Sequence, residues 1–296
     1  MTALPGAIDI REVGPRDGLQ AEEPASVGDR VRLIDALVAA GVRHIEAVSF
    51  VSPKAVPAMA DAADVMAQVQ RRSGVRWVAL VPNVRGAELA LASGVDEITV
   101  TISASPAYNE KNVRMSVDES LQAITAICAL AGDIPVDGVV SCAFGSPYEG
   151  ELAVADVVEL GERVVEAGAT SLTYADTTGM GTPRRVAELV SAAGVDIGFH
   201  FHDTRGTALV NAFVALEAGV TRFDASVGGL GGSPFAAGAA GNLATEDFVA
   251  MLDDLGVATP IDLETYLIAS AVAAEVVGHP LPSRVALAGP RSRLAG

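Results

Sequence analysis

The chain has few cysteines, few aromatic residues and too few basic residues to balance its acidic ones. Two cysteines among 296 residues, Cys128 and Cys142, cannot build a disulfide framework. The formal net charge of −17 argues against a basic face for nucleic acid or for an anionic membrane. No apolar run has the length of a membrane span, and the first residues lack the pattern of a signal peptide. We therefore expect a cytoplasmic protein that binds neither nucleic acid nor membranes.

The sequence does contain a regular alternation of short apolar runs and longer segments with helical periodicity. Half of the residues are apolar, which suits buried parallel strands covered by helices. The predicted strands are residues 8–13, 45–50, 77–81, 97–102, 136–142, 171–175, 197–202 and 222–227. The predicted helices are residues 28–41, 56–72, 84–92, 117–131, 155–167, 183–193, 207–218 and 245–255.

These eight strand–helix units predict an α/β protein with a (β/α)8 TIM barrel more than an open doubly wound sheet. The length also fits, because one such barrel uses about 250 residues. We assign residues 1–260 to a catalytic barrel domain. Residues 261–296 form a short C-terminal helical extension, with a further helix at 263–277, that we expect to pack on the barrel. Catalytic residues should then lie at the C-terminal ends of the strands.

Two histidines, His200 and His202, lie at the end of the seventh predicted strand. Residues i and i+2 of a strand point to the same side, so both imidazoles should face one point. In a closed barrel the loops after the last and first strands adjoin, and these loops carry Asn242 and Asp17. Two nitrogen and two oxygen ligands are typical of Mg²⁺ or Mn²⁺, whereas Zn²⁺ more often takes three protein ligands and a water. Histidines satisfied by core hydrogen bonds are the alternative, and Asp203 is expected to cap the next helix.

Two charged residues and one flexible loop surround this predicted metal site. Arg16 precedes Asp17 in a Gly/Pro turn, where it can stabilise an oxyanion or serve only as an ion-pair partner. Glu46, in the second predicted strand, can transfer protons or orient Arg16 or a metal ligand. A glycine-rich loop at residues 228–235 is interpreted as a lid with Ser233 as a hydrogen-bond or proton donor. A plain connector is the alternative for this loop.

Several segments together resemble the 3-hydroxy-3-methylglutaryl-CoA (HMG-CoA) lyase family, whose members are metal-dependent barrel enzymes. The matching segments are EVGPRDGLQ at 12–20, SFVSPK at 49–54, SCA at 141–143, PYEG at 147–150, HFHDT at 200–204 and GNLATED at 241–247. They occur in the expected order, so the resemblance covers nearly the whole predicted barrel.

The resemblance implies a carbon–carbon lyase that cleaves HMG-CoA, or a related branched 3-hydroxyacyl-CoA, to acetyl-CoA and a keto acid by a retro-Claisen reaction. It implies that Arg16 stabilises the enolate and that Glu46 takes part in proton transfer. The implied ligands of a divalent metal, Mg²⁺ or Mn²⁺, are Asp17, His200, His202 and Asn242. The implied substrate contacts are Gln20, Ser49, Thr173 and Thr177. We also expect a homo-oligomer, namely a dimer.

The chain departs from the family pattern at three positions. Ser233 stands where the lyases usually carry a cysteine tied to the proton step, and a hydroxyl is a far weaker acid than a thiol with a pKa of about 8.5. Either Ser233 only donates a hydrogen bond while Glu46 or a water serves as the acid, or the substrate differs. Glu23 stands where a lysine is frequent near the CoA end, and Asp137 replaces a basic residue.

Two other functions compete with the lyase prediction. A Claisen-type synthase, of the isopropylmalate or homocitrate synthase kind, shares the His-x-His pair and the Arg-Asp pair. Those synthases usually read Arg-Asp-Gly-Glu-Gln and carry a regulatory domain, whereas this chain has Leu19 at the glutamate position and ends soon after the barrel. A non-catalytic barrel homologue is the third possibility, and an intact set of four convergent ligands argues against it.

Overall fold

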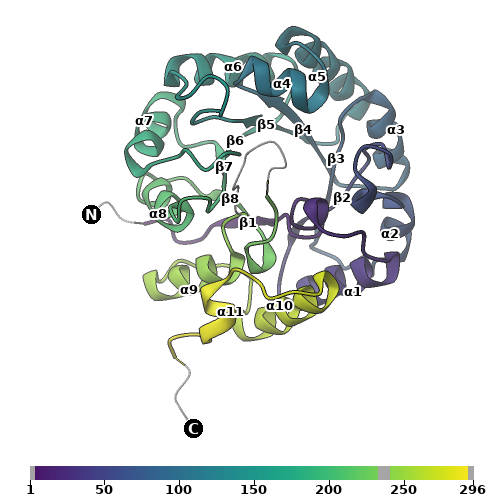
Figure 1. Ribbon diagram of the computed structural model, residues 1–296, viewed down its shortest axis with the longest axis vertical. Coiled ribbons are helices and arrows are strands. Elements are labelled where there is room, and N and C mark those ends of the chain that lie inside the picture. Colours follow the sequence, from purple (N-terminus) through teal and green to yellow (C-terminus); the bar gives the residue numbers. More distant parts are fainter. Residues whose placement is uncertain (1–3, 233–240, 293–296) are drawn as a thin grey trace.

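The computed structural model describes residues 4–232 and 241–292, so Ser233 lies outside the described residues. At its centre, eight parallel strands follow one another in chain order around a closed barrel (Figure 1). The strands are β1 Asp9–Glu12, β2 His44–Ser49, β3 Arg76–Leu80, β4 Glu97–Ser103, β5 Val136–Ser141, β6 Ser171–Asp176, β7 Gly198–Phe201 and β8 Arg222–Ala225. Because β1 pairs with both β2 and β8, the cylinder is closed and the predicted (β/α)8 barrel is confirmed.

Helices surround this barrel (Figure 1). The α-helices are α1 Val27–Ala39, α2 Ala62–Gln68, α3 Val84–Ala92, α4 Pro106–Val113, α5 Val117–Ala131, α6 Val154–Glu166, α7 Pro183–Ala193, α8 Ala208–Glu217, α9 Thr245–Leu255, α10 Leu263–Val277 and α11 Arg284–Ala288. Three short 3-10 helices are η1 Gly18–Ala21, η2 Pro57–Met59 and η3 Val227–Gly229. None of the helices within residues 4–232 and 241–292 has the length and apolarity that crossing a membrane requires.

The structure differs from the predicted helices at residues 56–72 and at α4, and it contains the short α11, which was not predicted. The predicted helix 56–72 is wrong in its extent, because Asp61 adopts a left-handed conformation with φ of 56° and separates η2 from α2. Helix α4 was not predicted, since its mostly polar sequence lacks a helical apolar period. It begins with Pro106 directly after Ser105, whose hydroxyl caps the first turn.

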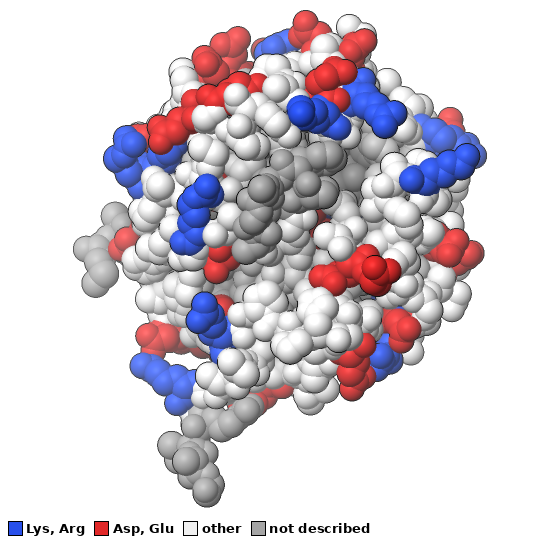
Figure 2. All heavy atoms as spheres, in the orientation of Figure 1, with Lys and Arg blue, Asp and Glu red and all other residues white. Residues whose placement is uncertain are grey.

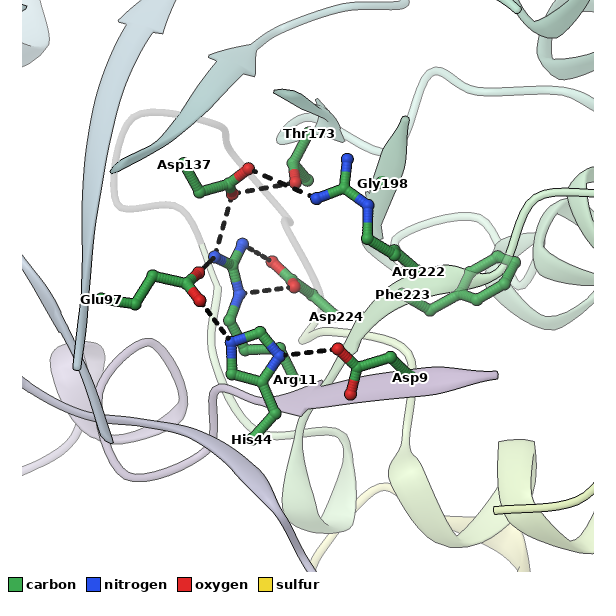
Figure 3. A pocket seen from close by; sticks show the side chains of 10 residues that line it. All are labelled: Asp9, Arg11, His44, Glu97, Asp137, Thr173, Gly198, Arg222, Phe223 and Asp224. Atoms are coloured by element: carbon green, nitrogen blue, oxygen red, sulfur yellow. Dashed lines mark hydrogen bonds and ion pairs between the residues drawn. The ribbon is translucent and has the colours of Figure 1, made fainter. Parts of the chain in front are cut away.

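Alternation along the strands separates an apolar core from a charged barrel interior. On β8, Phe223 points outward and packs against Phe248 of α9, with ring centroids 5.2 Å apart. The next residue, Asp224, points into the barrel and meets Arg11 of β1 (Figure 3). Successive strand residues face opposite sides of the sheet, so the apolar residues pack beneath the helices and the charged ones meet inside.

The C-terminal helices are joined to the barrel by buried polar contacts. Helix α10 lies against α1 and α9. The Tyr266 hydroxyl of α10 donates to Glu12 of β1, and the Ser270 hydroxyl donates to Glu246 of α9. Glu12 also accepts the backbone N–H of Val227 at the start of the glycine-rich loop. These contacts support the proposal that the extension packs on the barrel.

The buried Glu246 carboxyl makes stability depend on pH. Burial raises the pKa of Glu246 from 4.5 to about 7, although the Ser270 hydroxyl and the Gly228 N–H favour the ionised form. As the pH rises through this window, the unfolded chain has already lost the proton that the folded state still holds. The free energy of unfolding therefore falls as the pH rises toward the folded-state pKa.

We expect the substitution Glu246→Gln to flatten this fall, because glutamine stays neutral while retaining hydrogen-bonding groups. Urea denaturation between about pH 5 and about pH 8 measures the slope. The control is Glu159→Gln on the exposed face of α6, which should keep the slope of the unmodified protein. Equal slopes for the two variants would show that Glu246 is not the group responsible.

Candidate metal centre

Three of the predicted ligands meet at one point near the end of the barrel. One ligand atom each from Asp17, His200 and His202 lies within 4.8 Å of the other two. The two Nε2 atoms of the histidines are 3.1 Å apart, and Asp17 Oδ2 lies 3.9 Å from His200 Nε2. His200 lies on β7, and His202 is the first residue after that strand. The pleat of the strand therefore places both rings on one side.

Asn242, the fourth predicted ligand, lies beside this group. It forms a β-bridge with His202, and its Nδ2 donates to Asp17 Oδ2 at 2.7 Å and to the Leu230 carbonyl at 2.9 Å. Its Oδ1 is buried and has no hydrogen-bond partner among the described residues. This carbonyl oxygen lies next to a carboxylate and two imidazoles, and no described residue donates a hydrogen bond to it. Such a set of atoms fits a cation that prefers oxygen and nitrogen ligands.

The charge state of Asp17 also suits a metal ligand. Burial raises the pKa of this carboxyl, but the Arg16 guanidinium and the two imidazoles outweigh burial and lower the pKa to about 2. Asp17 is therefore ionised at neutral pH, and it is the one carboxylate in the group of three. A carboxylate held ionised within a buried cluster is a ready ligand for a divalent cation.

Arg16 is fixed between two acidic residues. Its Nε donates to Glu46 Oε2 at 2.5 Å, and its Nη1 donates to Asp17 Oδ1 at 2.6 Å. Glu46 is fully buried on β2, and its second oxygen, Oε1, has no hydrogen-bond partner among the described residues. The arrangement leaves a guanidinium held rigidly beside the predicted metal ligands and a carboxylate oxygen available to a substrate group.

The predicted substrate contacts differ in their surroundings. Ser49 is buried and its hydroxyl donates to the Leu80 carbonyl at 3.3 Å, while the Thr177 hydroxyl accepts from the Cys142 N–H at 3.1 Å. Gln20 is half-buried in η1. Thr173 lies deeper in the barrel, level with Gly198 of β7. These substrate contacts remain predictions.

Thr173 is engaged with the charged interior and not with the predicted metal ligands. Its hydroxyl donates to Asp137 Oδ2 at 2.9 Å, and it lines a small cavity together with Arg11 and Arg222 (Figure 3). A substrate role for this residue would need access below the level of His200, with which Ala175 of the same strand is paired.

Asp224, which was not predicted as a site residue, lies directly behind a predicted ligand. Its Oδ2 lies 3.0 Å from His200 Nδ1. Burial raises the pKa of the Asp224 carboxyl, but Arg11 and His200 outweigh it and hold the pKa well below its usual range. The available signal was an acidic residue at an inward position of the last predicted strand, next to the strand that carries the histidines.

Comparison with known proteins places the chain in a family. Residues 7–272 match the family model described as HMGL-like. The chain is 43% identical to the mitochondrial hydroxymethylglutaryl-CoA lyase of Macaca fascicularis, over 97% of this chain and 91% of that protein. It is also 43% identical to hydroxymethylglutaryl-CoA lyase YngG of Bacillus subtilis, over 95% of this chain and 96% of that protein.

A solved structure agrees with these relatives. An HMG-CoA lyase from Acinetobacter baumannii, in complex with coenzyme A and 3-methylmalate, matches with a TM-score of 0.94 and 39% identity over 100% of this chain and 99% of that one. The fold matches that of this solved lyase, and both the family model and the relatives cover nearly the whole chain. The chain therefore belongs to the HMGL-like family.

Proposed function

We propose that this chain is a metal-dependent lyase that cleaves HMG-CoA to acetyl-CoA and acetoacetate in a retro-Claisen reaction. The observation that carries the proposal is the convergence of Asp17, His200, His202 and Asn242 beside the Arg16–Glu46 pair. The names of its relatives support the substrate, and the solved complex with coenzyme A supports an acyl-CoA as the ligand.

The residues present fit a hard divalent cation. The ionised carboxylate, the two imidazoles and the unpartnered Asn242 carbonyl oxygen would hold Mg²⁺ or Mn²⁺. When bound, such an ion supplies a Lewis acid and a template for the hydroxyl and carboxylate oxygens of the substrate.

The residues of the chain account for the remaining requirements of the reaction. A base removes the proton of the tertiary hydroxyl, the carbon–carbon bond breaks, and the bonding electrons form the enolate of acetyl-CoA. The Arg16 guanidinium, held by Glu46 and Asp17, is placed to bind the enolate oxygen as negative charge develops. Glu46 Oε1 is available to accept or return a proton, and protonation of the enolate carbon completes acetyl-CoA.

The location of positive charge is consistent with an anionic substrate. The chain carries a net charge of −17, and Figure 2 shows acidic and basic side chains interspersed on one face without a continuous basic surface. An acyl-CoA that carries a carboxylate must therefore find its counter-charge locally. Arg16 and a cation held by Asp17 would provide it inside the site.

The direct test is incubation of the protein with HMG-CoA and Mg²⁺ or Mn²⁺, followed by measurement of acetoacetate. We expect acetoacetate and acetyl-CoA in equal amounts, and no product after removal of the metal with EDTA. If only a different branched 3-hydroxyacyl-CoA gives product, the proposed substrate is wrong but the proposed reaction type stands. Release of free CoA from acetyl-CoA and a 2-oxo acid would favour the synthase alternative.

The substitution Ser233→Cys should raise the rate of HMG-CoA cleavage. A thiol with a pKa of about 8.5 is a far better proton donor near neutrality than a serine hydroxyl. The control is Ser73→Cys on the exposed surface, which adds a thiol away from the site and should leave the rate unchanged. An unchanged or lower rate in Ser233→Cys would mean that Glu46 or a water already supplies the proton.

We further propose that the protein acts in the cytoplasm as a homodimer. The contacts of Gln20, Ser49, Thr173 and Thr177 with substrate belong to the same proposal. Sedimentation analysis of the purified chain tests the dimer.

A further inference from the structure

Behind His200, a chain of buried charges runs across the barrel interior. Asp224 of β8 lies between His200 of β7 and Arg11 of β1, and these residues are register neighbours on adjacent strands. Asp224 Oδ2 is 3.0 Å from His200 Nδ1. Arg11 binds both oxygens of the same carboxylate, with Nε to Oδ1 at 2.8 Å and Nη2 to Oδ2 at 2.9 Å (Figure 3).

The far side of Arg11 is held equally firmly. Its Nη1 donates to Asp137 Oδ2 of β5 at 2.9 Å and lies 3.6 Å from Glu97 Oε1 of β4. Asp137 in turn accepts from the Ser171 and Thr173 hydroxyls of β6, at 2.7 and 2.9 Å. Arg11 and Asp137 are almost fully buried, so the guanidinium is locked between opposite walls of the barrel.

This geometry matters for a histidine that is to bind a metal. A carboxylate at Nδ1 favours the tautomer with the proton on Nδ1. The lone pair on Nε2 is then free to bind a cation held between the neighbouring ligands. A buried carboxylate can serve this way only if its own charge is compensated and its orientation is fixed. The two-pronged contact from Arg11 provides both, because a guanidinium matches both oxygens of a carboxylate.

We propose that Asp224 and Arg11 are positioning residues that set the orientation of His200 and thereby the affinity of the centre for a divalent cation. The proposal rests on the metal site proposed above. It assigns a role in metal binding to a buried ion-pair network whose other role is to support the interior of the barrel. A purely structural role would change the stability of the fold and leave the intrinsic affinity of the folded protein for the cation unchanged.

The experiment is titration of Mn²⁺ into the full chain by calorimetry, together with thermal unfolding of each variant. We expect Asp224→Asn to weaken Mn²⁺ binding by about 10- to 100-fold, the usual effect of losing a carboxylate behind a metal-bound histidine. Arg11→Lys keeps the positive charge and loses the fork, so it should also weaken binding, by a smaller factor. The charge-reversed double variant Arg11→Asp, Asp137→Arg returns a guanidinium to the same position from β5 and should restore much of the affinity.

The matched control is Asp9→Asn, which makes the same chemical change at the edge of the same network. Asp9 contacts His44 and Arg76 and does not contact Asp224 or His200, so the Mn²⁺ affinity should stay at its original value. If Asp224→Asn does not fold, Arg11→Lys decides the question. Unchanged Mn²⁺ affinity in folded Asp224→Asn or Arg11→Lys would overturn the positioning role and leave the metal site intact. Absence of Mn²⁺ binding by the unmodified protein would overturn both proposals.

Discussion

The substitution Asp17→Asn should lower kcat for HMG-CoA cleavage by about a thousandfold or more, which corresponds to ~4 kcal/mol of lost transition-state stabilisation. Asparagine has nearly the same shape, but it removes the one carboxylate from the group that contains His200 and His202. It also removes the negative charge that holds Arg16, whose Nη1 lies 2.6 Å from Asp17 Oδ1. Steady-state kinetics at saturating metal, with metal affinity measured in parallel, checks the prediction.

Asp203→Asn is the matched control for this substitution. Asp203 follows His202 directly, and its Oδ1 accepts the N–H of Ala208, the first residue of α8, at 3.0 Å, although the N-cap position itself belongs to Thr207. Asparagine keeps a side-chain oxygen that can accept this N–H, so Asp203→Asn should change the stability little and retain kcat. A retained kcat in Asp17→Asn, or an equal loss in both variants, would contradict the assignment of Asp17.

The substitution Arg16→Met should lower kcat by about 100- to 1,000-fold, the typical cost of removing one donor from a developing oxyanion. KM should change much less, because the negative charge that Arg16 binds appears only as the carbon–carbon bond breaks. Arg16→Lys should recover part of the rate, because lysine keeps the positive charge. The recovery should be incomplete, because an ammonium group lacks the rigid fork of donors that can contact Glu46 and the enolate together.

Loss of Arg16 also leaves the buried Glu46 without its cation, so stability must be followed separately. Removal of one partner of a buried ion pair costs about 3–5 kcal/mol. Arg185→Met is a suitable control, because Arg185 is buried and donates to Glu151 at 2.8 Å, in a contact outside the predicted metal site. It should lower the unfolding temperature and preserve kcat. If Arg16→Met loses stability but keeps kcat, the enolate role is excluded.

Local signals were sufficient to predict the barrel, and barrel closure then brought the predicted ligands together. Short apolar runs and segments of helical periodicity are short-range features, and they located all eight strands to within about two residues. The convergence of Asp17 and Asn242 followed from closure alone, because the first and last strands of a barrel are neighbours. The His-x-His pair followed from the two-residue period of a strand.

Contacts that depend on register across the barrel could not be predicted in this way. From sequence, Asp137 is a departure from the family pattern that bears on substrate, but in the structure it lies inside the barrel, paired with Arg11. The contact of Asp224 with His200 likewise depends on which residues of β7 and β8 are level with each other. Such pairings join residues far apart in sequence, so no local pattern reveals them.

The central claim is that one divalent cation binds between Asp17, His200, His202 and Asn242. The most direct measurement is the anomalous diffraction signal of Mn²⁺ in crystals of the protein. We predict one strong peak, bonded to the Nε2 atoms of both histidines, to the Asp17 carboxylate and to Asn242 Oδ1. A crystal saturated with Mn²⁺ that shows no peak there, or a peak only elsewhere, would contradict the account.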